Sequence, residues 1–145
     1  MRWLGVDFGE IRVGLAISDP DERVAVPLEV VASSAAFPAI RSIVERDYVR
    51  GIVIGLPLLP SGDEGETAAR ARRLGDRIAR ALDLPVEYED ERLTTVVAEQ
   101  ITMRRGPVDD LAATIMLQQF IDRRRLAAHL HNGNGSSGLS SHVEE

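Results

Sequence analysis

Carboxylates are the side chains of this sequence best placed to do chemistry, and three of them fall where predicted elements begin or end. Asp7 follows the apolar run 3–6, Glu91 closes the acidic stretch 87–91, and Asp109 opens the last predicted helix. A carboxylate beside a buried strand is costly unless a cation or a donor compensates it. Three converging carboxylates make a hard oxygen site suited to Mg²⁺ or Mn²⁺, as in phosphodiester hydrolysis with two ions about 3.5–4 Å apart.

Each of these acids also has a simpler interpretation. Asp7 could cap the turn at Gly9 through its own backbone, and the stretch 87–91 could be a solvated face. Asp109 and Asp110 could form an ordinary helix N-cap. The sequence alone leaves both sets of interpretations open.

Periodicity separates the neighbouring acids from one another. At 100° per residue Asp109 falls on the apolar side of its helix, and Asp110 is rotated a quarter turn away. The apolar residues of that side are Ala113, Met116 and Phe120. Asp90 and Glu91 alternate between the two faces of a strand, so spacing does not decide which of them joins the site.

The residue counts exclude other kinds of catalysis. The sequence contains no cysteine and no lysine, so thiol nucleophiles, thiolate zinc sites and lysine nucleophiles are excluded. The three histidines, at 129, 131 and 142, all fall in the last 17 residues, where no further helix or strand is expected, which argues against a histidine-centred triad. A net charge of -6 argues against indiscriminate binding to nucleic acid or to anionic membranes, but leaves room for a local basic patch.

Apolar runs and helical spacing predict the elements that must position these acids. Strands are expected at 3–6, 13–18, 24–31, 52–56 and 84–89. Helices are expected at 37–48, after a capping box of Asp63 and Glu66, at 94–105, and from 109 to about 130. The helix after the capping box is expected to bury Ala71, Leu74, Ile78 and Leu82. A hairpin followed by alternating strands and helices predicts an α/β fold with a mixed five-stranded sheet flanked by helices.

Length and composition predict one folded domain with a polar tail. The 145 residues suit a single domain over residues 1–131, and residues 132–145, rich in glycine, serine and asparagine, are expected to be disordered. No targeting segment and no run of roughly 20 apolar residues is present. We therefore expect a soluble, cytoplasmic protein.

Arginines are the candidates for phosphate contact. Arg70, Arg73, Arg77 and Arg80 recur at helical spacing in one stripe, and Arg12, Arg104 and Arg105 could extend it. The simpler alternative is a solvated face with partial pairing to Glu66, Asp76 and Asp83. Arg92 could instead be an ion-pair partner that orients Glu91. No aromatic cluster accompanies the arginines, so recognition of the backbone and shape is favoured over base readout.

Four segments, taken together, resemble a known family. They are LGVDFGEIRVGLAISD at 4–19, VIGLPL at 53–58, DERLTT at 90–95 with Ala98, and VDDLAA at 108–113 with Ile115, Leu117 and Gln118. In this order they resemble the YqgF family, also called RuvX, over residues 4 to about 122.

The resemblance implies an RNase H-like fold related to the RuvC resolvases. It implies a metal-dependent nuclease with Mg²⁺ or Mn²⁺, assigned to 5′-end processing of precursor 16S rRNA or to Holliday junction resolution in branched DNA. By motif matching, the catalytic and metal-binding carboxylates would be Asp7, Glu91 and Asp109. Only Gly106 and Pro107 stand where relatives often carry a longer basic loop.

Two other classes of function stay open at this stage. A non-catalytic RNA-binding or ribosome-assembly module could share the fold without the metal site. An actin-like ATP-binding domain is the less favoured alternative, because Asp7 to Gly9 followed by Gly14 resembles a first phosphate loop but a second such domain is missing. A homodimer is equally open.

Overall fold

The computed structural model describes the backbone of residues 1–90 and 109–139, and the side chains of residues 1–90 and 111–130. Glu91, the predicted helix at 94–105, Arg92, Arg104 and Arg105 lie outside the described residues. The side chains of Asp109 and Asp110 also lie outside them.

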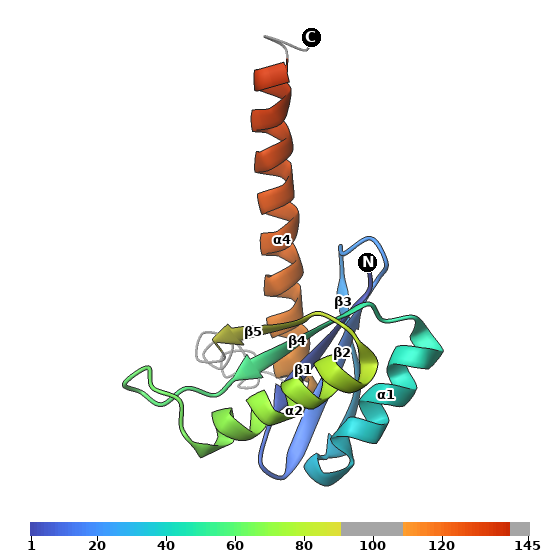
Figure 1. The fold of residues 1–145 in the computed structure, drawn as a ribbon, viewed down its shortest axis with the longest axis vertical. Helices are drawn as coiled ribbons and strands as arrows, with labels where there is room; N and C mark the ends of the chain where they lie inside the picture. The colour runs from blue at the N-terminus through green and yellow to red at the C-terminus, as the bar shows by residue number, and fades with distance from the viewer. Residues whose placement is uncertain (91–108, 140–145) are drawn as a thin grey trace.

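The described strands form one mixed sheet in the order β3-β2-β1-β4-β5 (Figure 1). The strands are β1 (Trp3–Phe8), β2 (Arg12–Ser18), β3 (Ala25–Ala32), β4 (Gly51–Leu56) and β5 (Val86–Asp90). The first three pair antiparallel, whereas β4 pairs parallel to β1 and β5 pairs parallel to β4. The predicted mixed five-stranded sheet is therefore confirmed, with β1 as its central strand.

Helices cover both faces of this sheet. The short η1 (Ser33–Ala35) leads into α1 (Ala36–Asp47), which lies with α2 (Glu66–Leu82) on one face, and α4 (Asp109–Leu139) crosses the other (Figure 1). Every residue of β4 is buried, as expected for a strand with helices on both sides. None of the helices within 1–90 and 109–139 is long and apolar enough to cross a membrane.

The start of α2 differs from the prediction. The N-cap is Gly65, which makes no side-chain capping bond, so the predicted capping box of Asp63 and Glu66 is wrong. The Asp63 carboxylate instead accepts a hydrogen bond from the Ser61 hydroxyl at 3.1 Å, because the loop before the helix closes on itself through a bridge between Leu58 and Glu64. The apolar face of α2 is as expected at Ala71 and Ile78, which are fully buried, while Leu74 and Leu82 are partly buried.

The end of α4 also differs from the prediction. The helix continues to Leu139 instead of ending near Leu130, so the backbone of residues 132–139 is helical in the structure (Figure 1). Its packing against the sheet ends near Ile121, and residues 122–130 are exposed. An α-helix satisfies its hydrogen bonds within its own segment, so it can extend past the body without a partner surface.

Candidate active site at the carboxyl ends of the parallel strands

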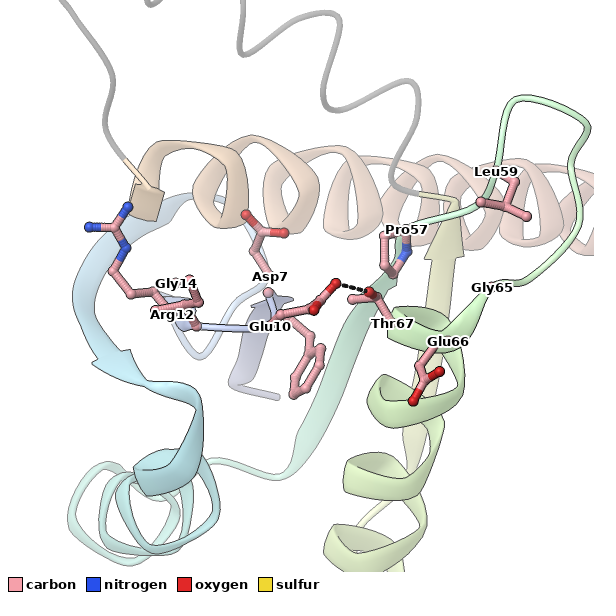
Figure 2. Close-up of a pocket in the computed structure, with 12 residues that line it drawn as sticks. Asp7, Glu10, Arg12, Gly14, Pro57, Leu59, Gly65, Glu66 and Thr67 are labelled. Carbon is pink, nitrogen blue, oxygen red and sulfur yellow. Dashed lines mark hydrogen bonds between the residues drawn. The ribbon is translucent and has the colours of Figure 1, made fainter.

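A cleft of about 700 Å³ opens where β1 and β4 end and α2 begins (Figure 2). The turn between β1 and β2 forms one wall, and the start of α2 with the preceding loop forms the other. Its lining residues include Asp7, Glu10, Arg12, Pro57, Glu66 and Thr67. Ligands of open sheets with parallel strands commonly bind at this edge, so the cleft is the candidate active site.

Asp7 is the predicted catalytic acid whose side chain the structure describes, and it lies in this cleft (Figure 2). It is the second-last residue of β1 and its side chain is half-buried. The strand therefore continues to Phe8, two residues past the predicted end at residue 6. Its partner in β2 is Gly14 and its partner in β4 is Gly55. Because paired residues face the same side of a sheet, both neighbouring strands lack a side chain beside the Asp7 carboxylate, which leaves room around it.

Glu89 of β5 lies in the same row of the sheet as Asp7. The register pairs Asp7 with Gly55 and Gly55 with Glu89, so the two acids lie on the same face of the sheet. This is the face covered by α4, because Trp3 and Val53 on the same side pack against that helix. The backbones of β1 and β5 are two strand spacings apart, roughly 9.5 Å. Glu89 forms an ion pair with Arg123 of α4. This ion pair links β5 to α4 just beyond the buried part of the helix.

Asp90, the last residue of β5, lies on the opposite side of the sheet from Asp7. Side chains alternate along a strand, so Asp90 shares the face of Tyr88, whose ring packs under Arg72 of α2. Asp90 therefore points away from the face that carries the Asp7 carboxylate.

The contacts of α4 with β1 place the first turn of the helix at the Asp7 end of the strand. Phe120 packs edge-on against Trp3 with ring centroids 4.7 Å apart, and Ala113 and Leu117 lie over Gly5. The helix α4, which begins at Asp109, therefore runs antiparallel to β1, and its first turns pass over Asp7 (Figure 2). The predicted core-facing residues Ala113, Met116 and Phe120 are buried against the sheet as expected.

Glu10 is a further acid of the cleft, and no sequence pattern singles it out. Its carboxylate accepts a hydrogen bond of 2.9 Å from the Thr67 hydroxyl, which joins the β1–β2 turn to the first turn of α2 (Figure 2). Glu10 stands in the first motif segment, but its partner is 57 residues away, so spacing could not reveal the contact.

The arginine stripe on α2 is only partly available to a ligand. A guanidinium nitrogen of Arg70 lies 3.7 Å from a carboxylate oxygen of Glu66, which is within ion-pair distance. The guanidinium carbon of Arg77 lies 3.9 Å from the centre of the Phe37 ring in α1. Arg73 and Arg80 are exposed, and within the described part of the chain neither has a carboxylate within ion-pair distance. The predicted partial pairing to Glu66 is therefore present in one residue of the stripe.

Arg72, which lies outside the stripe, fastens α2 to the loop before it. Its guanidinium donates two hydrogen bonds to Glu64, at 2.7 and 2.6 Å, and covers the ring of Tyr88. These bonds hold the pKa of the Glu64 carboxyl below its usual range, and burial raises the pKa of the Tyr88 hydroxyl. The wall of the cleft formed by this loop is therefore anchored to both α2 and β5.

Within the side chains that the structure describes, no cluster of three metal-ligating residues occurs. Two of the three predicted ligands, Glu91 and Asp109, lie outside those side chains. Of the three predicted ligands, the structure describes the side-chain surroundings of Asp7 alone. The metal-binding roles of Glu91 and Asp109 stay predictions.

Comparisons with known proteins place this architecture in a family. Residues 1–123 match the family described as "RuvX: Holliday junction resolvase". A protein of Chloroflexus aggregans named "Putative pre-16S rRNA nuclease" is 41% identical over 133 residues, covering 84% of this chain and 94% of that protein. A Roseiflexus protein of the same name is 38% identical over 135 residues, covering 86% and 96%.

Solved structures show the same fold. Thermus thermophilus RuvC, solved in complex with a Holliday junction substrate, gives a TM-score of 0.61 at 15% identity and covers 86% of this chain and 96% of its own. The fowlpox virus Holliday junction resolvase gives 0.51 at 9% identity, with 85% and 99% covered. The expected RNase H-like fold is confirmed, and the match over residues 1–123, together with relatives aligned over most of their own length, shows that this chain belongs to the RuvX family.

Proposed function

We propose that this protein is a divalent-metal-dependent nuclease that hydrolyses phosphodiester bonds in structured nucleic acid. The observation that carries the proposal is the position of Asp7: it lies one residue before the end of the central strand, glycines flank it in both neighbouring strands, and it lines the cleft. Membership of the RuvX family supports the same conclusion.

The donor set fits a hard divalent cation. Asp7, Glu91 and Asp109 are the residues that would hold Mg²⁺ or Mn²⁺, because carboxylate oxygens are the preferred ligands of these ions. Gly14 and Gly55 place no side chain beside the Asp7 carboxylate, which favours an ion at this position. Two such ions, when bound, would supply activation of a water molecule and stabilisation of the leaving oxygen.

The alternation of β5 favours Glu91 over Asp90 as the second carboxylate. Asp90 lies on the α2 face with Tyr88, whereas Asp7 and Glu89 lie on the α4 face. A strand that continued by one residue would bring residue 91 to the face of Asp7. Of the two acids that the spacing leaves open, Glu91 is therefore the one we propose.

The substrate that we propose is precursor 16S rRNA or a branched DNA junction. Relatives about 40% identical carry the first in their name, and the family description carries the second. Both are folded nucleic acids, which a protein recognises largely through phosphates and shape. Arg12 at the cleft and the exposed Arg73 and Arg80 on α2 are the described residues that we propose for phosphate contact.

The test is a cleavage assay of wild type and Asp7→Asn on precursor 16S rRNA, single-stranded RNA and four-way DNA junctions, with Mn²⁺, Mg²⁺ or EDTA. We expect metal-dependent cleavage by wild type, and a loss in Asp7→Asn larger than the roughly 10–100-fold that follows removal of an outer-shell partner of a metal. Substrate binding by the variant should persist. Added Mn²⁺ should raise the melting temperature of wild type and raise that of the variant less.

The matched control is Asp21→Asn, which makes the same change at an exposed position between β2 and β3. It should cleave as wild type does. Binding of these substrates without cleavage under any metal would support a non-catalytic RNA-binding module in place of the nuclease. Wild-type rates in Asp7→Asn would show that the catalytic assignment of Asp7 is wrong.

A further inference from the structure

The turn between β1 and β2 presents an apolar side chain to solvent at the mouth of the cleft. Ile11 is 79% exposed, more than any other large hydrophobic residue in the part of the chain that the structure describes. It lines the cleft together with Asp7, and its chain neighbours Glu10 and Arg12 are both charged. At this exposure the side chain adds little to the core, so folding does not account for it.

The turn that carries Ile11 is held in place from two sides. The backbone N–H of Ser33 donates to the Ile11 carbonyl at 2.8 Å, and the Ser33 hydroxyl donates to the Glu10 carbonyl at 2.6 Å. From the opposite side, the Thr67 hydroxyl donates to the Glu10 carboxylate (Figure 2).

The start of the turn is equally constrained. A Cβ on Gly9 would lie 2.5 Å from the Arg12 carbonyl oxygen, so the backbone closes more tightly there than a side chain permits. The apolar tip is therefore presented in a fixed position, and binding it costs little ordering entropy.

A nucleobase is the partner that fits such a tip. Nucleic-acid-binding proteins insert single apolar side chains such as isoleucine or leucine between base steps, which unstacks the bases. The tip lines the same cleft as Asp7, where the proposed reaction places a phosphate, and its chain neighbour Arg12 carries the positive charge that a nucleic-acid backbone attracts. A protein partner is disfavoured, because a stable interface needs on the order of 1,000 Å² and one isoleucine provides only a small part of that area.

We propose that Ile11 packs against a base next to the scissile phosphate and holds that nucleotide unstacked. The inference rests on the proposed nuclease function and specifies its substrate: the enzyme cleaves at a step that is paired or stacked in the free nucleic acid and must be opened. Ile11 is thus a specificity-determining residue, distinct from the carboxylates.

The experiment compares Ile11→Ser with wild type on two probes whose cleavage position is first mapped with wild type. One probe is the four-way DNA junction or RNA stem that wild type cuts, with 2-aminopurine beside the cut, and the other has the same sequence with the opposite strand omitted around the cut. We expect Ile11→Ser to lower kcat/KM on the paired probe roughly tenfold, since burying one isoleucine side chain against a base is worth about that factor. On the unpaired probe the rate should stay near that of wild type.

Fluorescence supplies a readout that a structural disturbance would not reproduce. In the Asp7→Asn background, binding of the paired probe should raise 2-aminopurine emission, and Asp7→Asn with Ile11→Ser should bind without this rise. Leu126→Ser is the control, because Leu126 is also exposed, at 58%, on the part of α4 beyond the sheet.

Equal losses on both probes, or an unchanged fluorescence rise in the Ile11→Ser background, would overturn the role of Ile11 while leaving the nuclease proposal intact. A failure of the nuclease proposal is recognised separately, because wild type itself would then cut neither probe.

Discussion

Gly5 of β1 and Leu117 of α4 lie closer together than any larger residue at position 5 would permit. A Cβ on Gly5 would stand 2.9 Å from the Leu117 Cβ and 3.3 Å from the Ala113 carbonyl oxygen. The backbones of the central strand and the helix are therefore in direct contact two residues before Asp7. Because α4 begins at Asp109, this contact determines how far the start of the helix lies from the end of β1 that carries Asp7.

Gly5→Ala should therefore lower both stability and activity. The added methyl group must push α4 away from β1, and overpacking of this kind costs about 1–3 kcal/mol. The same displacement moves the start of α4 relative to Asp7, so kcat should fall more than the melting temperature alone explains. Thermal unfolding and steady-state cleavage below the melting transition measure the two effects.

Gly75→Ala is the matched control for this prediction. A Cβ on Gly75 would lie 2.1 Å from the Tyr88 hydroxyl oxygen, so it also overpacks the structure, but on the α2 face. It should lose stability, and the kcat of the folded protein should fall less than in Gly5→Ala, because Asp7 and α4 lie on the other face of the sheet. If Gly5→Ala retained wild-type kcat, the contact would not position the site.

Arg73→Ala should weaken binding to every nucleic acid by a similar factor. Phosphate contacts carry no base information, and each contact removed should reduce the slope of log affinity against log salt by roughly 0.7–0.9. Arg73 is preferred over Arg77 for this test because Arg77 also packs on Phe37 and its loss would disturb the α1–α2 contact. Turnover at saturating substrate should stay near wild type.

Salt titrations monitored by fluorescence anisotropy measure that slope. Arg46→Ala provides the comparison, since Arg46 is exposed at the end of α1 and is paired with Asp47. It should leave the slope unchanged. Identical slopes for Arg73→Ala and wild type would assign Arg73 to the solvated surface.

Glu22 links the N-terminus to α4, and the stability of the protein should therefore depend on pH in the acidic range. Its carboxylate accepts hydrogen bonds from the N-terminal ammonium at 3.0 Å and from Arg124 of α4 at 2.7 Å. Burial raises the pKa of Glu22, but these two cations lower it by more, so it lies below its ordinary value of 4.5. The stabilisation is therefore present above about pH 4.5 and is lost as the pH falls through the lowered pKa.

Glu22→Gln should consequently lower the melting temperature at pH 7 and differ little from wild type near pH 3. Melting curves across this range, with the exposed Glu45→Gln of α1 as the comparison, measure the effect. A constant difference between Glu22→Gln and wild type at all pH values would mean that packing, and not the charge of Glu22, is responsible.

Truncation after His131 should leave fold and cleavage intact. In the described side chains, the contacts of α4 with the rest of the chain extend as far as Arg125, which donates to the Glu22 carbonyl oxygen. Removing the residues beyond 131 therefore takes away no described contact, and the melting temperature should stay within about 2 °C of wild type. A loss of activity in the truncated protein would show that the last residues take part in function.

The sequence by itself determined the order of the strands and helices that the structure describes, and most of their bounds to within a few residues. Apolar runs such as 52–56 and the helical spacing of Ala113, Met116 and Phe120 are local patterns, and burial on two faces or on one side of a helix produces them directly. The same local pattern identified Asp7 as an unusual acid in an apolar strand. The mixed sheet and the carboxylate candidate follow from such information alone.

Only the tertiary structure decided how these elements meet. The row of Asp7, Gly55 and Glu89, the opposite placement of Asp90, and the bond from Thr67 to Glu10 join residues far apart in the chain. Strand register and side-chain contacts of this kind depend on the packing of whole layers, because a shift of one residue would turn every side chain to the other face. No local pattern carries that information, so the cleft, the fixed turn and the face of each acid emerge only when the sheet and its helices are assembled.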